Sequence, residues 1–395
     1  MEILDMVKIV KENDANELKR IKDAEDLKCS NFTLDCPNSS GFIPYYNITI
    51  LHAAAFYDSL ECFIFLIDEC GFTYREESAN SYFPLHYACC SGAYEVASYI
   101  LEKDPEEAKM VPPGLSHHFL FFAAIGGNPE IMRELFEKGA DLSNRANTLD
   151  DPIGRAVMVG NIACLKILLE HGKIGASGDN SPIINSVINS RPDATMILLE
   201  SASPEDIVKF NREGKSFFTY AAFCGIKFKE PVLYALKLIG SLPIEVPRES
   251  PEKGVCHWIC QFADLEIAEA MLSTRFYDIN RYILKAGSGP YQLLDRKDLK
   301  EDTIIQLLSL LIQKGFDLNR RENLNNNNGL PDTPSLLEKI CLFTMIKLYK
   351  VIGFLIDHGA DPMAPCVRNG KPLYDNIKER KMLKLLEVFD EHMHK

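Results

Sequence analysis

The sequence lacks any apolar run long enough to cross a lipid bilayer, and it lacks the start of a secretory signal. Its most apolar stretches, such as Phe119 to Gly127, are about nine residues long, whereas a membrane-spanning helix needs roughly 20. The first five residues, Met1 to Asp5, carry acidic side chains where a signal peptide would carry basic ones, and no apolar segment follows them. We therefore expect a cytoplasmic protein that has no signal peptide and does not enter the membrane.

The sequence also lacks an excess of positive charge. It has 43 Lys and Arg residues against 56 Asp and Glu residues, which gives a net charge of -13. Because a uniformly acidic chain repels phosphate groups, we expect no nucleic acid and no membrane among its partners. Apolar residues make up 46% of the chain and charged residues 25%, which is the usage of a folded protein and excludes wholesale disorder.

Cysteine is plentiful, but the spacing that would make it a metal ligand is absent. The twelve cysteines do not show the paired spacing of a structural zinc site. Several occupy helical core positions, so we expect free, buried thiols in the reducing cytosol. The segment Cys256 to Cys260 includes His257 and so resembles a ligand set, but we interpret it as core. The glycosylation sequons at Asn31, Asn38 and Asn47 are then chance occurrences.

Motifs of catalysis are missing as well. The sequence has no complete phosphate-binding loop, dinucleotide-binding glycine motif, zinc-protease motif or nucleophile elbow. His86 could form a thiol–imidazole pair with Cys89 or Cys90 on one helix face, although a structural role for this histidine is favoured. The clustered carboxylates, which we interpret as solvated charges at a helix end, are Asp104, Glu106 and Glu107. We expect no enzymatic activity, no cofactor and no metal.

What the sequence does contain is an internal repeat. The segments Leu51 to Ala55 and Pro84 to Ala88 are similar, and each leads into an apolar helix about ten residues later. The position held by Pro84, which we call the marker, recurs at intervals that average about 36 residues. The ten markers are Ile50, Pro84, Phe119, Pro152, Pro182, Phe217, Val255, Pro290, Pro334 and Pro372.

These segments resemble the ankyrin-repeat family, whose unit of about 33 residues carries a Thr-Pro-Leu-His-x-Ala signature. Thr49 to Ala54 and Phe83 to Ala88 match that signature with one or two changes. Asn211 to Ser216 matches the family's turn, and Gly139 to Leu142 and Gly359 to Pro362 match its Gly-Ala-Asp ending. The resemblance covers roughly residues 1 to 392. It implies an all-α, ankyrin-repeat α-solenoid of helix-turn-helix units joined by β-hairpin-like turns.

The resemblance also divides the chain. Residues 1–49 would form an N-terminal capping unit with an extended connection, and residues 50–392 an array of about ten units. An asparagine-rich segment at 322–332 is expected to form a loop. In the eighth and ninth units the marker lies 25 residues before the glycine that ends the second helix, against 20 in the third and fourth units. We expect a longer turn between the two helices there, with ordinary drift in a tolerant loop as the alternative to a function.

The chemistry of single residues agrees with such a unit. Proline at the marker suits the first turn of a helix, and glycine suits the end of one. Glycines expected to end the first helix are Gly92, Gly127, Gly160 and Gly225; those expected to end the second are Gly71, Gly139, Gly172, Gly315 and Gly359. One helix pair cannot bury both of its faces, so neighbouring pairs must cover it. The resemblance implies that His52, His86 and His257, two residues after their markers, make structural hydrogen bonds.

In this family the hairpin tips and the first helices line a groove that binds partners. Transferring those positions gives the candidate partner-binding residues Tyr45, Tyr46, Phe56, Tyr57, Tyr82, His117, His118, Lys215, Phe223 and Phe262. Aromatic side chains at such positions suit binding hot spots, although imperfect repeats could instead pack their own turns with aromatics. His117 and His118 are interpreted as solvated turn residues rather than as metal ligands.

The sequence thus predicts a monomeric, non-catalytic protein-binding scaffold or adaptor with a protein partner. One alternative is a substrate-recruiting adaptor of a protein-modifying complex such as a ubiquitin ligase. The other is an enzyme with a cryptic site among the repeats, which would require a deep pocket with converging titratable groups.

Overall fold

The computed structural model shows a helical protein that divides into two bodies, Met1–Ala202 and Ser203–Lys395. We call them the N-terminal and the C-terminal body. The structure describes residues 3–22, 27, 32–34, 43, 46–79, 81–110, 118–142, 151–172, 180–240, 242, 255–263, 265–272, 279–280, 282–283, 287–321, 333–344 and 348–393. The boundary between the bodies falls between the fifth and the sixth repeat, so each body contains five of the ten markers.

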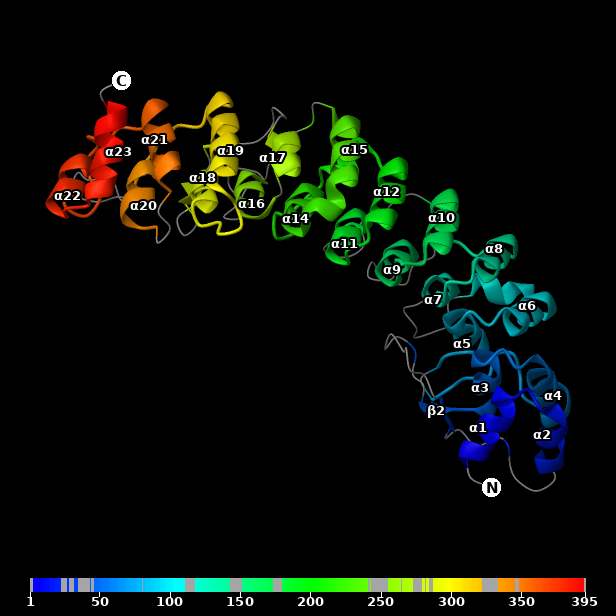
Figure 1. Cartoon of the computed structure of the whole chain (residues 1–395). Coiled ribbons are helices and arrows are strands. Elements are labelled where there is room, and N and C mark those ends of the chain that lie inside the picture. Colours follow the sequence, from blue (N-terminus) through cyan, green and yellow to red (C-terminus); the bar gives the residue numbers. More distant parts are fainter. Residues whose placement is uncertain are drawn as a thin grey trace. The chain divides into compact units, whose positions relative to one another are not determined.

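The N-terminal body stacks helix pairs in two layers (Figure 1). Its layer of first helices consists of α1 (Ile3–Lys11), α3 (Ile50–Phe56), α5 (Pro84–Ser91), α7 (Phe119–Gly126), α9 (Pro152–Val159) and α11 (Pro182–Ile188). Its layer of second helices consists of α2 (Ala15–Lys22), α4 (Leu60–Cys70), α6 (Tyr94–Lys103), α8 (Pro129–Glu137), α10 (Ile162–His171) and α12 (Pro192–Ser201). A 3₁₀ helix, η1 (Pro105–Lys109), follows α6. Each helix packs against the helices of the same layer in the adjacent repeats, so stability arises from a sum of neighbouring interfaces.

The C-terminal body continues the same arrangement. Its first helices are α14 (Phe217–Cys224), α16 (Val255–Phe262), α18 (Gly289–Leu293), α20 (Leu336–Leu342) and α22 (Leu373–Glu379). Its second helices are α15 (Lys229–Ile239), α17 (Leu265–Leu272), α19 (Glu301–Gln313), α21 (Tyr349–Asp357) and α23 (Leu383–Met393). Two short helices, α13 (Pro204–Ile207) and η2 (Gly225–Phe228), precede α14 and α15 respectively. The layers α14–α16–α18–α20 and α15–α17–α19–α21–α23 are each continuous through direct packing.

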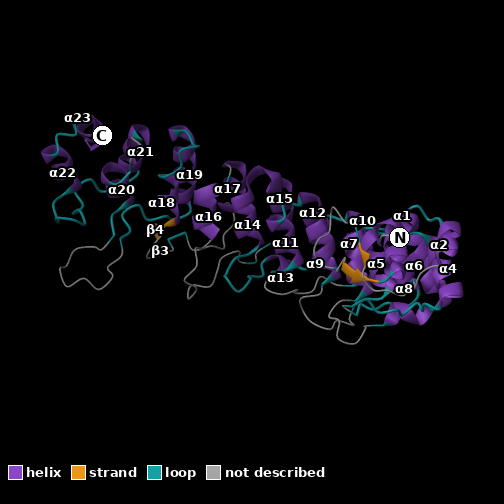
Figure 2. Ribbon diagram, turned by 90° about the horizontal axis from the view of Figure 1, so that it is seen from below, coloured by secondary structure: helices purple, strands orange, loops and turns teal. Residues whose placement is uncertain are grey.

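Strands are a minor component of the described residues, as Figure 2 shows. In the N-terminal body β1 (Phe32–Thr33) pairs antiparallel with β2 (Tyr46–Ile48), with an irregular register between its two residues. In the C-terminal body β3 (Tyr282–Ile283) pairs antiparallel with β4 (Gly287–Ser288). Both pairs end next to a first helix, where the family resemblance places its hairpin-like turns. The predicted helical-repeat class is therefore confirmed.

The markers begin first helices as predicted in most repeats. Proline is the first residue of α5, α9 and α11, and the other markers up to Val255 also start their helices. The last three repeats deviate by one or two residues. Pro290 is the second residue of α18, Pro372 lies at the N-cap of α22, and α20 starts two residues after Pro334 because Ser335 caps it. The Ser335 hydroxyl accepts a hydrogen bond from the Glu338 amide at 3.1 Å.

Two of the glycines that end first helices also allow the next repeat to approach closely. Gly127 and Gly160 have φ values of 76° and 89°, a region that side chains with a Cβ atom avoid. A Cβ atom would lie 2.7 Å from the Asn161 side chain at Gly127 and 2.7 Å from the Arg191 guanidinium at Gly160. The predicted C-cap at Gly172 is different, because its φ of -160° is extended backbone.

Polar side chains in the turn between the helices tie each repeat to the preceding one. Asn128 donates to the Gly92 carbonyl at 3.0 Å, Asn161 to the Ala124 carbonyl at 2.7 Å, and Arg191 to the Val159 carbonyl at 3.0 Å. In the C-terminal body Arg296 donates to the Ala263 carbonyl at 2.7 Å. These bonds satisfy carbonyls that a helix end leaves unpaired. They explain why the turn can be short and still hold adjacent repeats in register.

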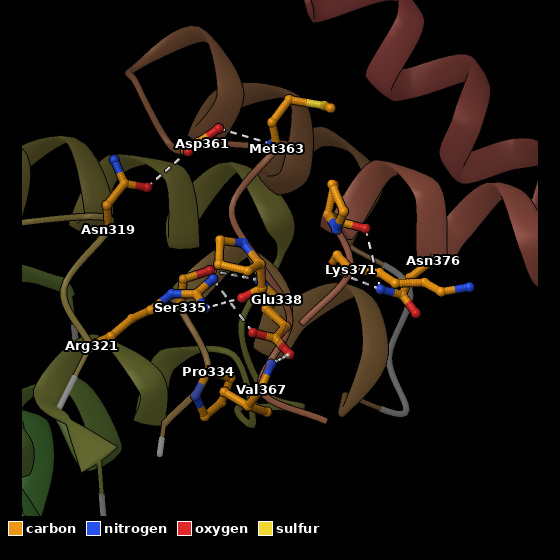
Figure 3. Close-up of polar contacts among 12 residues, drawn as sticks. Asn319, Arg321, Pro334, Ser335, Glu338, Asp361, Met363, Val367, Lys371 and Asn376 are labelled. Atoms are coloured by element: carbon orange, nitrogen blue, oxygen red, sulfur yellow. Dashed lines mark hydrogen bonds and ion pairs between the residues drawn. The ribbon is translucent and has the colours of Figure 1, made fainter. Parts of the chain in front are cut away.

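A second set of cross-repeat bonds lies at the far end of the second helices. Asn280 accepts from the Asp317 amide and donates to the Gly315 carbonyl, and Asn319 makes the same two bonds with Asp361 and Gly359 one repeat later. Figure 3 shows Asn319 pointing at Asp361, whose carboxylate in turn accepts from the Met363 amide. The Gly-Ala-Asp ending was predicted from the sequence, but the asparagine of the preceding repeat that forms hydrogen bonds with it was not.

The turns between the helices of the eighth and ninth repeats are longer than those of the other repeats, as predicted. Seven residues separate α18 from α19 and six separate α20 from α21, against two between α7 and α8. The turn of the eighth repeat does not extend freely into solvent, because Arg296 anchors it to the seventh repeat. The asparagine-rich segment 322–332 lies outside the described residues. None of the described helices combines the length and the apolarity that a bilayer span requires.

Candidate partner-binding surface

Apolar side chains remain exposed at the carboxyl ends of the first helices. In the C-terminal body Phe223 at the end of α14 is 56% exposed. In the N-terminal body Met158 and Val159 at the end of α9 and Ile188 at the end of α11 are 36–44% exposed. The opposite sides of these helices are fully buried, for example at Phe218. The exposed ends therefore present apolar surface that the described residues of the same body leave uncovered.

In the C-terminal body this surface is aromatic. The Phe223 and Phe262 rings meet edge to face with centroids 4.8 Å apart, and the Trp258 ring stacks on Phe262 at 5.8 Å. Tyr220 and Phe223 are three residues apart on α14, and Trp258 and Phe262 are four residues apart on α16. These spacings place each pair on one helix face. We call Tyr220, Phe223, Trp258 and Phe262 the aromatic patch.

Lys215 lies against the same patch. Its Nζ atom is 5.8 Å from the ring centroids of both Tyr220 and Trp258, which is within the range of a cation–π interaction. The Asn211 carboxamide positions the lysine, because its oxygen accepts from the Lys215 amide at 2.8 Å. Glu213 forms an ion pair with the Lys215 ammonium at 2.6 Å. The structure thus places two sequence-predicted residues, Phe223 and Phe262, beside a third, Lys215.

A hollow of about 520 Å³ adjoins the patch at Phe262. It opens between the end of α16 and the long turn that follows α18. Its lining residues are Gln261, Phe262, Gln292, Asp295, Arg296, Lys297 and Asp298. The Arg296 guanidinium holds the Asp298 carboxylate through two hydrogen bonds, at 3.1 and 2.5 Å, and this contact lowers the pKa of Asp298. The hollow is open to solvent, which suits a side chain of a partner better than an enclosed substrate.

The predicted residues of the N-terminal body do not form one cluster. The Phe56 and Tyr57 rings meet edge to face at 5.3 Å, and the Lys11 ammonium lies 5.4 Å from the Tyr57 ring centroid. Tyr57 is at the carboxyl end of α3, whereas the Tyr82 carbonyl lies 3.0 Å from His52 near the start of that helix. The Tyr82 ring packs instead against His86 and Phe122, at 5.4 and 5.6 Å.

Four of the predicted residues have other outcomes. Tyr45 and His117 lie outside the described residues, and Tyr46 is described only as part of strand β2. His118 is 7% exposed and accepts a hydrogen bond from the Leu120 amide at 3.2 Å as the N-cap of α7. The prediction of a solvated turn residue is therefore wrong for His118. Its ring is held inward because it caps the helix that begins at the next residue.

His52, which follows the first marker by two residues, has the structural role that the resemblance implied. His52 Nε2 lies 3.0 Å from the Tyr82 carbonyl and 3.1 Å from the Glu76 carbonyl, and Nδ1 lies 2.8 Å from the Thr49 hydroxyl. His52 thus connects its own turn to the following hairpin. Burial lowers the pKa of His52 to about 4 and that of His118 to about 4. Both rings are neutral at physiological pH.

The thiol–imidazole alternative finds no support in the geometry. His86 Nδ1 accepts a hydrogen bond from the Phe83 amide at 2.9 Å, and burial raises the pKa of the Cys89 thiol well above its usual range. A protonated, buried thiol is a poor nucleophile. Among the described residues, no three His, Cys, Asp or Glu side chains come together as a metal site would need.

The interpretation of Glu107 as a solvated charge is wrong. Its side chain is 0% exposed and lies 3.5 Å from the Arg75 Nε atom, whereas Glu106 beside it is 70% exposed. Burial, the largest effect, raises the pKa of Glu107 to about 7, although Arg75 opposes the shift. The 3₁₀ turn η1 rotates Glu107 inward, which the sequence spacing did not reveal.

Met158, Val159 and Ile188 are not among the residues predicted from the sequence. Met158 and Val159 directly precede Gly160, which ends α9, so the repeat pattern could have indicated them. Ile188 has no such signal, because Asn189 rather than glycine ends α11. Trp258 was also missed. It lies in the middle of its helix, where its ring stacks on Phe262 and lies against the Lys215 ammonium.

The comparisons with known proteins agree with the repeat architecture. A family model described as ankyrin repeats, in three copies, matches residues 7–111. The described helix pairs give the fold of a helical repeat protein, and the chain contains ankyrin repeats within residues 7–111. The solved structures similar to it include the human ASB11 ankyrin repeat domain, with 20% sequence identity and a TM-score of 0.46 over 58% of this chain and 96% of that one. A comparison with curated proteins gives no match. No catalytic family is among the matches.

Proposed function

We propose that this protein is a non-catalytic binding module that recognises another protein through the aromatic patch of its C-terminal body. The observation that carries the proposal is the exposure of Phe223, which stays 56% exposed while contacting Phe262. Aromatic side chains that are fixed by neighbours and open to solvent are the usual centres of protein interfaces, because little side-chain entropy is lost when they bind. Ankyrin repeats generally mediate such interactions.

The surroundings of the patch support a protein partner rather than a small substrate. The patch spans two neighbouring first helices, α14 and α16, and continues into the hollow against α18. Charged groups surround the apolar rings, as in the polar rim of an interface.

A photo-crosslinking experiment tests this proposal. Benzoylphenylalanine replaces Phe223 or Phe262 in the full chain, and as a matched control it replaces Leu233, which is 37% exposed on the second helix α15. After irradiation in cells, positions 223 and 262 are expected to capture the same polypeptide, and position 233 is not. Capture of the same polypeptides at all three positions, or of none at 223 and 262, would contradict the proposal.

A further inference from the structure

The charged groups around the aromatic patch are arranged with their acids outward. Three ion pairs border the patch and the hollow: Lys215 with Glu213, Arg296 with Asp298, and Lys339 with Asp295. The three carboxylates are 63%, 62% and 59% exposed, whereas the three cations are 24%, 8% and 17% exposed. At these three pairs an approaching partner therefore meets carboxylate oxygens, while the paired cations lie beneath them.

The cations are held inward by contacts of their own. Arg296 donates to the Ala263 carbonyl. Lys339 donates to the Tyr291 carbonyl at 3.1 Å and lies 5.0 Å from the Tyr291 ring centroid. Lys215 lies over Tyr220 and Trp258. These contacts keep the cations from turning outward to meet an acidic partner. Lys297 is the exposed cation that lines the hollow.

We propose, building on the proposed function, that the aromatic patch and the hollow bind an extended basic segment of the partner. In this arrangement an apolar side chain of the segment packs on Phe223 and Phe262, and an arginine or lysine enters the hollow. The Asp295 Oδ1 atom accepts no hydrogen bond from the described residues and is free to accept one from the partner. Asp298, held in its carboxylate form by Arg296, supplies a second acceptor.

Charge complementarity favours this occupant at long range as well as at contact. The whole chain carries a net charge of -13, so a basic segment is attracted and an acidic one repelled before either touches the surface. The patch already accommodates a cation on its rings, since the Lys215 ammonium lies over Trp258. The aliphatic stem of a partner arginine can pack on the Phe262 ring while its guanidinium remains among the carboxylates.

The geometry also sets the spacing within the segment. Neighbouring helices pack roughly 8–10 Å apart, and an extended chain advances about 3.3 Å per residue. An apolar residue that packs on Phe223 and Phe262, between α14 and α16, lies one helix spacing from a basic residue in the hollow between α16 and α18. The two residues are therefore about three residues apart. A segment of this kind has leucine and arginine separated by two small residues.

Trp258, the only tryptophan of the chain, provides a direct reporter. Three tryptophan-free synthetic peptides are titrated into the full-length protein and followed by Trp258 fluorescence and by calorimetry. The first peptide contains leucine and arginine at the stated spacing, the second has glutamate in place of arginine, and the third has serine in place of leucine. We expect the first peptide to bind at least about tenfold more tightly than either of the others.

Variants assign this preference to the hollow. The double variant Asp295→Asn with Asp298→Asn is expected to weaken binding of the first peptide by about fivefold or more. Asp302→Asn is the matched control, because Asp302 is 74% exposed and paired with Lys350 on the second-helix layer. It removes one exposed carboxylate away from the hollow and is expected to change affinity by less than about twofold.

Three results would overturn the inference: equal or tighter binding of the glutamate peptide, no binding of the arginine peptide in either measurement, or an equal loss in Asp302→Asn. These results are separable from failure of the proposed function. If crosslinking at positions 223 and 262 captures a partner while the arginine peptide does not bind, the binding module stands and the basic-segment inference is rejected. If crosslinking fails as well, both are rejected.

Discussion

The Phe223 and Phe262 rings meet edge to face 4.8 Å apart, although they belong to different repeats. Their contact is direct across the α14–α16 interface, which holds the sixth and seventh repeats together. Since Phe223 keeps 56% of its surface exposed, it gains only part of the roughly 1.5–3 kcal/mol that full burial of such a side chain provides. The pair therefore contributes more to the exposed apolar surface than to the buried core. The stability of variants can test this.

Replacing Phe223 with alanine is expected to lower the free energy of unfolding by less than about 1 kcal/mol while abolishing most of the partner binding. The matched control is Phe218→Ala on the same helix, because Phe218 is 0% exposed. That variant is expected to cost about 3–5 kcal/mol through the cavity it leaves. Urea unfolding followed by circular dichroism measures both. Similar losses of stability in the two variants would show that Phe223 is a core residue.

Tyr57 and Tyr82 need separate single variants, because Tyr57 lies at the carboxyl end of α3 and Tyr82 lies near its start. Tyr57→Ala removes a ring covered by Lys11 and is expected to cost little stability. Tyr82→Ala removes contacts with His86 and Phe122 and is expected to cost about 1–2 kcal/mol. Thermal melting of the two proteins compares them. A larger loss of stability in Tyr57→Ala than in Tyr82→Ala would show that the Tyr82 contacts are not the more stabilising ones.

The sequence predicted the positions of the helix pairs better than it predicted the binding surface. Prolines, first-helix glycines and marker histidines act through local backbone geometry, so a repeated pattern locates them to within one or two residues. Exposure of a side chain depends on which neighbouring repeat covers it. For this reason His118 was placed in solvent although it is buried, whereas partner binding by Phe223 and Phe262 stays a prediction.

The Lys339–Asp295 ion pair and the anchoring of Arg296 could not be predicted from sequence spacing. Lys339 lies 44 residues from Asp295, and Arg296 binds a carbonyl in the preceding repeat. The direction in which each pair points is set by the long turn of the eighth repeat. The sequence showed that this turn was long, but its folding back against the seventh repeat depends on contacts between distant residues.

Gly160 is expected to be much less tolerant of substitution than Gly359. The two glycines have similar φ values, 89° and 95°, so an alanine at either pays the left-handed penalty of about 1–2 kcal/mol. Only at Gly160 would the new Cβ atom meet the Arg191 guanidinium, whereas at Gly359 nothing lies within 4 Å. Gly160→Ala should therefore lose about 1 kcal/mol more, because the bond from Arg191 to the Val159 carbonyl is displaced. Equal unfolding midpoints in urea would mean that Arg191 contributes nothing between repeats.

The N-terminal body is expected to lose stability in mild acid through His118. Its pKa is about 4 when folded and 6.5 otherwise, so the unfolded chain takes up the proton first. Stability from this group is complete above about pH 6.5, declines as the pH falls towards about 4, and changes no further below that. The shift corresponds to about 3 kcal/mol.

His118→Asn keeps a side chain that caps α7 but removes the titration. Compared with the unsubstituted protein, this variant is expected to be similar near about pH 7.5 and more stable near about pH 5. The control is His358→Asn, since His358 is exposed and bonds only within its own helix end. Urea unfolding at the two pH values decides the matter, and parallel losses in all three proteins would rule out a role for His118.

Glu107 is expected to make the N-terminal body less stable as the pH rises, which is the opposite of the effect of His118. Its pKa rises from 4.5 to about 7 on folding, so the folded protein holds the proton more tightly than the unfolded chain does. The stability that this group provides is complete below about pH 4.5 and is lost as the pH rises through about 7, by roughly 3 kcal/mol in total. Glu107→Gln keeps the shape of the neutral side chain, and the stability of this variant should therefore vary less between about pH 5 and about pH 8.

Glu106→Gln on the same 3₁₀ turn is the matched control, because Glu106 is 70% exposed and pairs with Lys109 at the surface. Urea unfolding of the three proteins across this range should show a flattened profile for Glu107→Gln alone; an unchanged slope in that variant would mean that the buried carboxyl group does not titrate near neutral pH.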